Sequence, residues 1–460
     1  MAIIPQPALF GWQEIEAASD MDRLKLVLSV MPDEKLMQRL EKLRGKGRND
    51  YPIRPTWNAV LAGIVFQHPS IASLRRELLR YAELRQVCGF DLILGEKAVP
   101  TDDAFSHFLG LLMENQAELE ALFHDLVRKL GQALPDLGNK LAVDSKAIPS
   151  FGKPVRAEEK REEDDRRRDT DADWGTKTYK GSRKDGGKWE KLTRWFGYKL
   201  HILVDSAYEL PLAFEITKAS EADSLHLIPL VEQNEERNPE VAKRAEELAA
   251  DKGYDSEENN QTLYEVHGIK PIIDTRCLWK DEPDQPRVLF GERYDVFSYD
   301  EKGRVYCTCP ITGEQRDMFF HGFEKDRGTL KYRCPAAAYG LTCKGRNECQ
   351  KLAPSGVSDY GRIVRIPLDY DRRIFTPVAR HTLKWERAYA RRSAVERVNS
   401  RLDRVLGFEQ HTIRGMKKMK VRITLALMVM LAMALGRIQY NQAELMRSLT
   451  AAVKRKQQAA

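Results

Sequence analysis

Between residues 139 and 275 the sequence alternates short apolar runs with segments of helical period, and this alternation limits the possible folds more than any other feature. The first three runs predict an antiparallel meander, and a helix, a strand, a second helix and a last strand follow. The region therefore predicts a mixed α/β sheet covered by helices. Strands are expected at 141–148, 198–204, 210–217, 248–251 and 270–273, and helices at 224–231 and 256–266.

Two of these strands carry an aspartate at the end of an apolar run. Asp144 closes Lys-Leu-Ala-Val-Asp, and Asp251 closes Glu-Leu-Ala-Ala-Asp. Since α/β folds place their chemistry at strand ends, both carboxylates are candidates for a functional site. Asp205, Asp255 and Asp274 also end or adjoin apolar runs, and the strand pattern alone does not exclude them.

Residues 389–404 contain no proline or glycine and predict a helix. Tyr389, Arg392 and Glu396 share one face of this helix, at positions i, i+3 and i+7. A lone glutamate among arginines is typical of an exposed salt bridge. Together with the two strand aspartates, however, it would complete the three carboxylates that two-metal phosphoryl transfer requires. The other flank is apolar and is expected to be buried; it consists of Val395, Val398 and Leu402.

Three short motifs carry a resemblance to a known family. Val-Asp-Ser-Lys around Asp144, Asp-Lys-Gly-Tyr-Asp from Asp251 onward, and Tyr-x2-Arg-x3-Glu ending at Glu396 resemble the DDE transposases of bacterial insertion sequences. The resemblance covers most of the chain, from near residue 55 to near residue 440. It implies a ribonuclease H-like catalytic domain in which Asp144, Asp251 and Glu396 are the catalytic, metal-binding residues.

The family signature continues to a lysine seven residues after the glutamate, and here that position is Asp403. Arg404 beside it and Arg401 nearby carry positive charge. Either arginine could replace the lysine in binding DNA.

Cleavage of a phosphodiester needs an activated water and a stabilised phosphorane, which two divalent cations can supply. Carboxylates are hard ligands, so Mg²⁺ is expected, with Mn²⁺ as a substitute. No histidine-rich or thiolate pattern competes for a catalytic metal. The candidate phosphate ligands are Tyr389, Arg392, Lys146 and Lys252. For the two lysines, the alternative is a solvated surface charge.

Residues 1–135 are expected to form a helical N-terminal domain. Residues 57–66 are strongly apolar, 67–70 predict a turn and 71–81 have helical spacing, which suits either a helix-turn-helix or an ordinary helical bundle. Thr101 is a candidate N-cap of a long amphipathic helix that reaches residue 130. By resemblance, such a domain binds the terminal inverted repeats of its element.

The segment 153–194, within the first part of the catalytic domain (136–275), is rich in charge and poor in aliphatic residues. This composition predicts a mobile loop. One interpretation is a solvated insertion. The other is a loop that contacts DNA, because Trp174 and further aromatic side chains alternate with Lys and Arg, a pattern suited to base stacking and phosphate contact.

Residues 276–375 interrupt the catalytic domain with a β-rich insertion, for which the turns predict two hairpins. The insertion holds Cys307 and four further cysteines. A small β domain gains much stability from a metal, so a structural Zn²⁺ is one interpretation, and reduced thiols are the other. The expected zinc ligands are Cys309, Cys334, Cys343 and Cys349.

The second part of the catalytic domain (376–440) contains the Glu396 helix, and a polar tail (441–460) follows. An apolar helix at 421–439 is expected to pack on the catalytic domain. Its most apolar run, 423–435, is too short to span a bilayer, so no membrane partner is expected.

The N-terminus lacks the pattern of a signal peptide, and the seven cysteines are an odd number, which together favour a reducing compartment. A bacterial cytoplasmic, nucleoid-associated protein is expected. The net charge of +7 permits nucleic-acid binding. The resemblance implies double-stranded DNA as the partner, both terminal inverted repeats and target DNA, and a homodimer in the synaptic complex.

The first functional hypothesis is a transposase that cleaves the element's ends and transfers the 3′-hydroxyls to target DNA. A ribonuclease H-like nuclease or resolvase without strand transfer is an alternative. The third hypothesis is a catalytically inactive DNA-binding remnant, which Asp403 at the lysine position favours and the three intact carboxylates disfavour.

Overall fold

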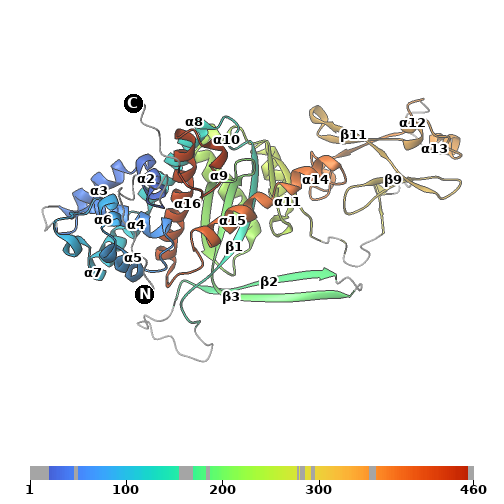
Figure 1. The fold of residues 1–460 in the computed structure, drawn as a ribbon. Coiled ribbons are helices and arrows are strands. Elements are labelled where there is room, and N and C mark those ends of the chain that lie inside the picture. The colour runs from blue at the N-terminus through green and yellow to red at the C-terminus, as the bar shows by residue number, and fades with distance from the viewer. Residues whose placement is uncertain are drawn as a thin grey trace, which may run out of the picture.

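The computed structural model describes residues 20–45, 50–154, 169–182, 187–276, 279, 285–291, 296–351 and 359–453. Figure 1 shows three parts in a row: a helical N-terminal region, a central sheet with its helices, and a β-rich insertion at the far end. The mixed α/β class predicted from the sequence is confirmed.

The N-terminal region is helical, as predicted. Ser70 and Thr101 cap their helices, because each hydroxyl accepts a hydrogen bond from a backbone N–H of the first turn. The long helix expected to reach residue 130 is in fact two, because the backbone of Asn115 (φ −111°, ψ 35°) departs from helical geometry. The side-chain oxygen of Asn115 accepts a hydrogen bond from Arg39. The helices are α2 (Asp20–Val30), α3 (Glu34–Arg44), α4 (Ile53–Val65), α5 (Ile71–Arg80), α6 (Ala82–Cys88), α7 (Asp102–Glu114) and α8 (Gln116–Ala133), with the 3₁₀ turn η1 (Gly95–Ala98) before α7.

The central sheet has the strand order β2-β3-β1-β5-β6, with β4 paired to β3. Strands β1, β3 and β4 form the predicted antiparallel meander, whereas β5 and β6 lie parallel to β1. This is the order expected of a ribonuclease H-like domain. The strands are β1 (Lys140–Pro149), β2 (Asp173–Ser182), β3 (Lys188–Asp205), β4 (Leu210–Lys218), β5 (Glu247–Ala250) and β6 (Lys270–Ile273).

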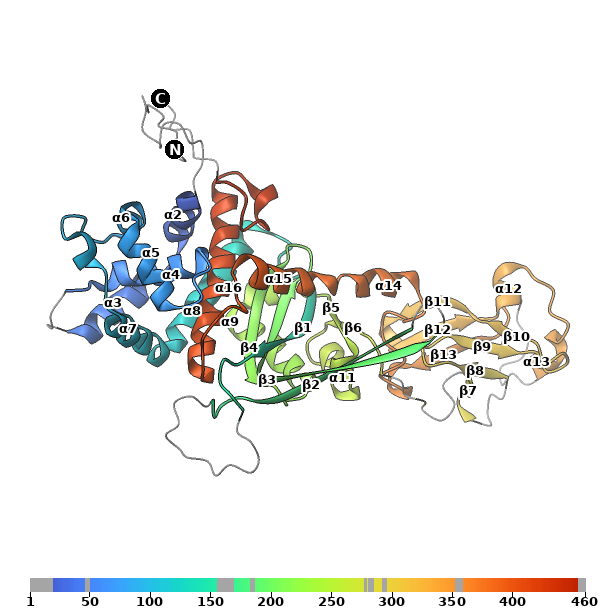
Figure 2. The same ribbon diagram turned by 60° about the horizontal axis from the view of Figure 1, so that its bottom comes forward.

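Helices cover both faces of this sheet. The crossovers from β4 to β5 and from β5 to β6 place α9 (Leu227–Arg237) and α11 (Glu257–Glu265) together on one face. On the other face, α14 (Leu383–Ala390) and α15 (Ser393–Val405) run across β1, β5 and β6 (Figure 2). The short helices η2 (Asp223–His226), α10 (Pro239–Ala242) and η3 (Lys252–Tyr254) complete the crossovers.

The hairpin β2–β3 corrects the expectation of a mobile loop at 153–194. Residues 173–182 and 188–194 are strands, and the hairpin extends away from the sheet toward the insertion (Figure 2). The reason is cross-strand packing: Gly175 lies opposite Trp195 and Gly181 opposite Trp189, and each indole covers its glycine closely enough that a Cβ would clash. Residues 155–168 and 183–186 of the expected loop lie outside the described residues.

Helix α16 (Met416–Gln439) confirms the expected apolar core helix but is longer than its most apolar run. Its length and composition would suffice to cross a membrane, but 89% of its most apolar window is buried inside the protein. It packs against α2, α4, α8 and β4, so that the N-terminal helices and the sheet share one continuous core.

The insertion contains two small sheets around its own apolar core. Both predicted hairpins are present, one formed by β8 and β9 and the other by β11 and β12. The strands are β7 (Arg287–Val288), β8 (Phe297–Tyr299), β9 (Val305–Thr308), β10 (Gln315–Asp317), β11 (Phe319–Glu324), β12 (Thr329–Arg333) and β13 (Ile363–Pro367), with the helices α12 (Pro335–Tyr339) and α13 (Arg346–Lys351).

The expected single helix at 389–404 is divided. Helix α14 ends at Ala390 and α15 begins at Ser393, and the N–H groups of Arg391 and Arg392 bond to carbonyls three residues back rather than four. The predicted apolar flank of α15 is buried, which fixes the face that the helix turns toward the sheet. Its members are Val395, Val398 and Leu402.

Candidate active site

Asp144 lies in the middle of β1, in register with Ile202 of β3. Its carboxylate is almost buried, and one oxygen accepts a hydrogen bond of 2.8 Å from the backbone N–H of Ser145. Burial and the negative charge of Asp251 raise the pKa of Asp144 to about 6, although the charges of Lys177 and Arg392 oppose the shift. The two aspartates therefore lie close enough to act on each other.

Asp251 directly follows β5, the parallel neighbour of β1. Its side chain accepts the N–H of Gly253 at 2.7 Å and so caps the short turn η3. This bond fixes the carboxylate at the strand end, where the sequence predicts it. Tyr254, in the same turn, is fully buried and belongs to the core.

Glu396 is in the first turn of α15, and its side chain remains 57% exposed. Arg392, the residue directly before this helix, bridges Glu396 and Asp144. One guanidinium nitrogen lies 2.7 Å from Glu396 Oε1 and the other lies 3.2 Å from Asp144 Oδ2. The guanidinium of Arg392 thus links two carboxylates that are far apart in the sequence.

A cleft of about 990 Å³ opens beside these residues. Asp251 and Glu396 line it, as do Ser145 and Lys146, which follow the almost buried Asp144 on β1. Residues of the hairpin β2–β3 line it as well, namely Thr176, Lys177, Thr178 and Trp195. Two of the three candidate carboxylates, from β5 and α15, therefore line one cleft, and Asp144 of β1 is joined to Glu396 through Arg392.

Lys146 is held by two carboxylates at this cleft. Its ammonium lies 2.6 Å from Asp403 Oδ2 and 3.0 Å from Glu409 Oε1, and only 10% of its side chain is exposed. Asp403 occupies the position where the family signature has lysine. A lysine on the adjacent strand thus lies beside this position.

Of the other candidate DNA-binding residues, some line the cleft and some do not. Arg404 and Lys252 line the cleft and are exposed. Arg401 does not reach it, because its guanidinium binds the side chain and the backbone oxygen of Glu209 at 2.7 Å each. Trp174 lies on β2, 53% exposed, beside Phe196 rather than among the lining residues.

Tyr389 is on α14, apart from the helix of Glu396. Its ring stacks on Trp385 at 4.9 Å between centroids, and the guanidinium of Arg392 lies 5.9 Å from it. Tyr389 therefore supports Arg392 from one side.

Asp223 was not found from the sequence, although it lines the same cleft. It accepts hydrogen bonds from Lys199 Nζ at 2.8 Å and from Ser145 Oγ at 3.0 Å. Although burial acts in the opposite direction, Lys199 holds the pKa of Asp223 below its ordinary value. Asp223 directly precedes the helix predicted at 224–231 and is the first residue of η2, so the local pattern gives no sign of its place beside the catalytic candidates.

Two of the other aspartates at or near the ends of apolar runs have structural roles. Asp205 accepts backbone N–H groups of Ala207 and Tyr208 and closes the turn between β3 and β4. Asp255 is buried and pairs with Arg373.

The donor chemistry of the site suits a hard divalent cation, because a cation would offset both the burial and the mutual repulsion of Asp144 and Asp251. In the part of the chain that the structure describes, however, no three Asp, Glu, His or Cys side chains converge to hold a metal ion. At the cleft, the guanidinium of Arg392 is hydrogen-bonded to one carboxylate oxygen of Asp144 and one of Glu396. Metal binding by all three carboxylates would therefore require Arg392 to move.

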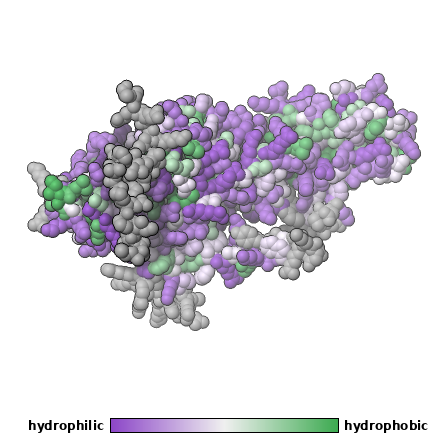
Figure 3. Space-filling view, in the orientation of Figure 1, coloured by the Kyte–Doolittle hydropathy of each residue, from purple (hydrophilic) through white to green (hydrophobic). Residues whose placement is uncertain are grey.

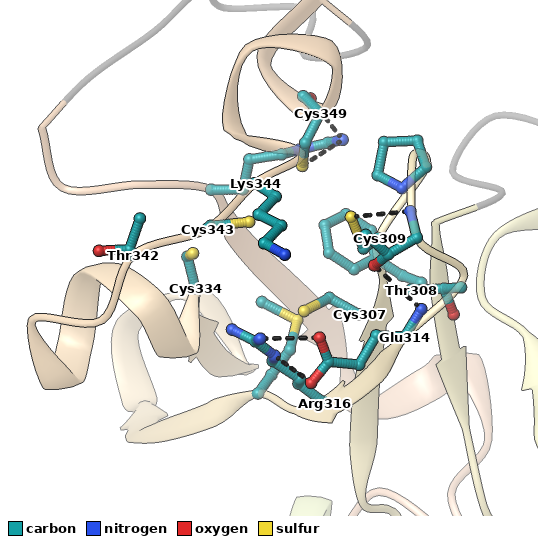
Figure 4. Close-up of a pocket in the computed structure, with 15 residues that line it drawn as sticks. Cys307, Thr308, Cys309, Glu314, Arg316, Cys334, Thr342, Cys343, Lys344 and Cys349 are labelled. Atoms are coloured by element: carbon teal, nitrogen blue, oxygen red, sulfur yellow. Dashed lines mark hydrogen bonds and ion pairs between the residues drawn. The ribbon is translucent and has the colours of Figure 1, made fainter.

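The candidate zinc ligands are not part of this cleft. Cys309, Cys334, Cys343 and Cys349 line a separate cavity in the insertion (Figure 4).

Comparison with known proteins supports the resemblance. A family model described as a transposase DDE domain matches residues 137–432, a span that contains all three candidate carboxylates. No curated protein sequence matches the chain significantly.

Proposed function

The chain belongs to the transposase DDE domain family and is thereby a transposase-type, metal-dependent nuclease; from this premise we propose that it cuts DNA at the ends of a bacterial insertion sequence and joins the freed 3′-hydroxyls to target DNA. The observation that supports this proposal is that Asp251 and Glu396 line one cleft, and that Arg392 joins Glu396 to Asp144 on the strand parallel to β5.

These three carboxylates would hold the divalent cations, with Mg²⁺ as the physiological ion and Mn²⁺ as a substitute. Bound there, the cations would supply an activated water and stabilise the leaving 3′ oxygen. The protein's own contribution is to hold the carboxylates on rigid elements. The Gly253 N–H fixes Asp251, and the Ser145 N–H fixes Asp144.

Arg392 links metal binding to DNA binding. In the free protein its charge offsets Asp144 and Glu396. Cations held by these carboxylates would compete with the guanidinium for the same oxygens, and a freed guanidinium could bind a DNA phosphate, for which its fork of donors is well suited. The ring of Tyr389 lies 5.9 Å from this guanidinium.

Basic side chains around the cleft would bind the phosphates on either side of the reacting one. They act by charge and direct no base sequence, so this part of the binding is expected to be salt-dependent. In the view of Figure 3, the surface over the central sheet is mainly hydrophilic, which suits a polyanionic substrate. The basic lining residues are Lys146, Lys177, Lys199, Lys252, Arg276 and Arg404.

The hairpin β2–β3 would grip DNA that has been distorted at the cleavage site. Its base lines the cleft, and Trp174 and Trp189 on its strands remain 53% and 39% exposed. Exposed indoles on a two-stranded ribbon can stack on unpaired bases. The helical N-terminal region would bind the terminal inverted repeats, and two chains would act together, because two ends must be brought together before joining.

A joining assay with pre-cut ends tests the proposal against simple hydrolysis. Duplexes that carry the element's end with an exposed 3′-hydroxyl are incubated with the protein, Mg²⁺ and a supercoiled plasmid. Joined products are expected for wild type and absent for Asp251→Asn. Cleavage of uncut ends without any joined product would instead support a nuclease or resolvase without strand transfer.

A further inference from the structure

Five cysteines of the insertion line one cavity of about 260 Å³, away from the catalytic cleft. They come from separate elements: β9 and the residue after it, the N-cap of α12, the turn after α12, and α13. Figure 4 shows their sulfur atoms arranged around a shared space. The cysteines are Cys307, Cys309, Cys334, Cys343 and Cys349, and none of them is in a disulfide.

The tip of the insertion around this cavity has little apolar packing. Among the described residues, the core of the insertion includes none between 335 and 351, although α12 and α13 lie there. The larger apolar side chains of the tip, Ile311, Tyr339 and Leu341, are more than half exposed. Two helices of five and six residues cannot be held in place by their own backbone bonds, so another interaction must fix them to the sheets.

Four of the thiols form the inner group. Cys307, Cys334, Cys343 and Cys349 all line the cavity, and Figure 4 shows their sulfur atoms around the space between β9 and the segment that contains α12 and α13. Cys309 differs: its sulfur accepts the backbone N–H of Thr312 at 3.4 Å, within the turn between β9 and β10.

We propose that Cys307, Cys334, Cys343 and Cys349 bind one structural Zn²⁺. Four thiolates are a common tetrahedral zinc set, and each thiol loses its proton on binding. The described side chains do not yet converge at ligand distance. One change of χ1 rotamer moves a cysteine sulfur by roughly 3 Å, and the proposal requires such changes to bring the four sulfurs to one ion.

The surroundings of the cavity suit the charge of such a site. A zinc ion with four thiolates carries two net negative charges, and Lys344, Arg316 and Arg362 line the cavity. Arg362 contacts the Cys349 sulfur at 3.9 Å and its carbonyl oxygen at 3.2 Å, and its own carbonyl accepts the N–H of Cys334. Such outer contacts orient metal ligands.

The ion would join the sheet of β7–β10 to the helices that follow β12. Cys307 lies on β9 of that sheet. Cys334, Cys343 and Cys349 lie in the segment between β12 and β13, which contains both helices. Zinc would thus supply the cross-link that the missing apolar core does not, and this role is independent of the proposed DNA chemistry.

The test measures the zinc content of the full-length protein by elemental mass spectrometry. The protein is purified with a reductant and without chelators. One zinc per chain is expected for wild type, and loss of zinc is expected in Cys343→Ser and Cys307→Ser. Cys309→Ser, a matched change in the same cavity, should retain the ion. Zinc retained in Cys307→Ser but lost in Cys309→Ser would overturn the assignment of the fourth ligand.

A second measurement does not depend on variants that fold poorly. Wild type in which Co²⁺ replaces zinc should show the thiolate-to-cobalt absorption of a tetrahedral sulfur site. A wild-type protein without zinc, and without that absorption after Co²⁺ is added, would overturn the proposal.

Discussion

Lys146 Nζ lies 2.6 Å from Asp403 Oδ2, so a lysine on β1 and an aspartate on α15 form an ion pair at the point where the family signature places a lysine on the helix. A lysine ammonium is therefore present at this corner of the cleft, but on the strand instead of the helix, and it is paired with Asp403 and Glu409. This pair weakens the argument that Asp403 marks an inactive remnant.

If Lys146 supplies this charge to a DNA phosphate, Lys146→Ala should slow end cleavage by roughly 10- to 100-fold, because one electrostatic contact in the transition state is lost. The exchange Lys146→Asp with Asp403→Lys should recover part of the rate, which single-turnover cleavage can measure. Lys218→Ala, at the exposed end of β4, is the control. Cleavage by Lys146→Ala at the wild-type rate would show that the lysine takes no part in the reaction.

Arg392→Gln should bind Mn²⁺ more tightly than wild type in the absence of DNA, because the guanidinium no longer competes for Asp144 and Glu396. The same variant should cleave DNA poorly, because it lacks the phosphate contact. Calorimetry of Mn²⁺ binding and a cleavage assay measure the two effects separately. Weaker metal binding by Arg392→Gln would contradict the proposed competition.

Trp174→Ala should weaken binding of DNA with an unpaired end by about 1–3 kcal/mol, the range for one base stacked on an aromatic ring. Thermal stability should hardly change, because the indole is 53% exposed. Leu192→Ala is the matched control, since Leu192 is 50% exposed on β3 of the same hairpin but offers no ring. Equal losses of affinity in the two variants, measured by fluorescence anisotropy, would argue against stacking.

Acidification should destabilise the contact between α8 and the sheet domain. Burial lowers the pKa of His124 to about 4 from 6.5, and its ring accepts a hydrogen bond from Asn238. The unfolded chain therefore takes up this proton first. The stabilisation is present above pH 6.5 and is lost as the pH falls toward 4, by at most about 3 kcal/mol.

Thermal midpoints measured from pH 7 to pH 5 check this expectation. His124→Gln should show a shallower decline than wild type, though not a flat one, because burial also lowers the pKa of His201 and His411. His107→Gln, at an exposed position of α7, should decline as wild type does. An unchanged slope in His124→Gln would exclude His124 as a source of the pH dependence.

The strands that carry the candidate carboxylates could be predicted because their signal is local. Strand β6 has the predicted bounds, and Asp251 follows β5 as its apolar run indicates. The buried flank of α15 was likewise evident from the spacing of Val395, Val398 and Leu402. Whether Asp144, Asp251 and Glu396 are the catalytic residues stays a proposal.

What could not be predicted depends on partners distant in the sequence. The strands of the β2–β3 hairpin look like a loop because their composition is polar, and only the register shows that Trp195 and Trp189 cover glycines on the opposite strand. Asp223 lines the cleft and is held there by hydrogen bonds from Lys199 and Ser145. Arg401 lies outside the cleft because Glu209 binds its guanidinium. None of these pairings has a signature within its own segment.

The most direct test of the three-carboxylate site is Mg²⁺-dependent cleavage of a duplex that carries the element's own end, comparing wild type with Glu396→Gln. Glu386→Gln on α14, an exposed glutamate outside the residues that line the cleft, serves as the control. Wild type and the control should free a 3′-hydroxyl at the end, whereas Glu396→Gln should bind the same DNA without cutting it. If wild type and Glu396→Gln both bind and neither cuts with Mg²⁺ or Mn²⁺, the protein is a DNA-binding remnant and the proposed catalysis is wrong.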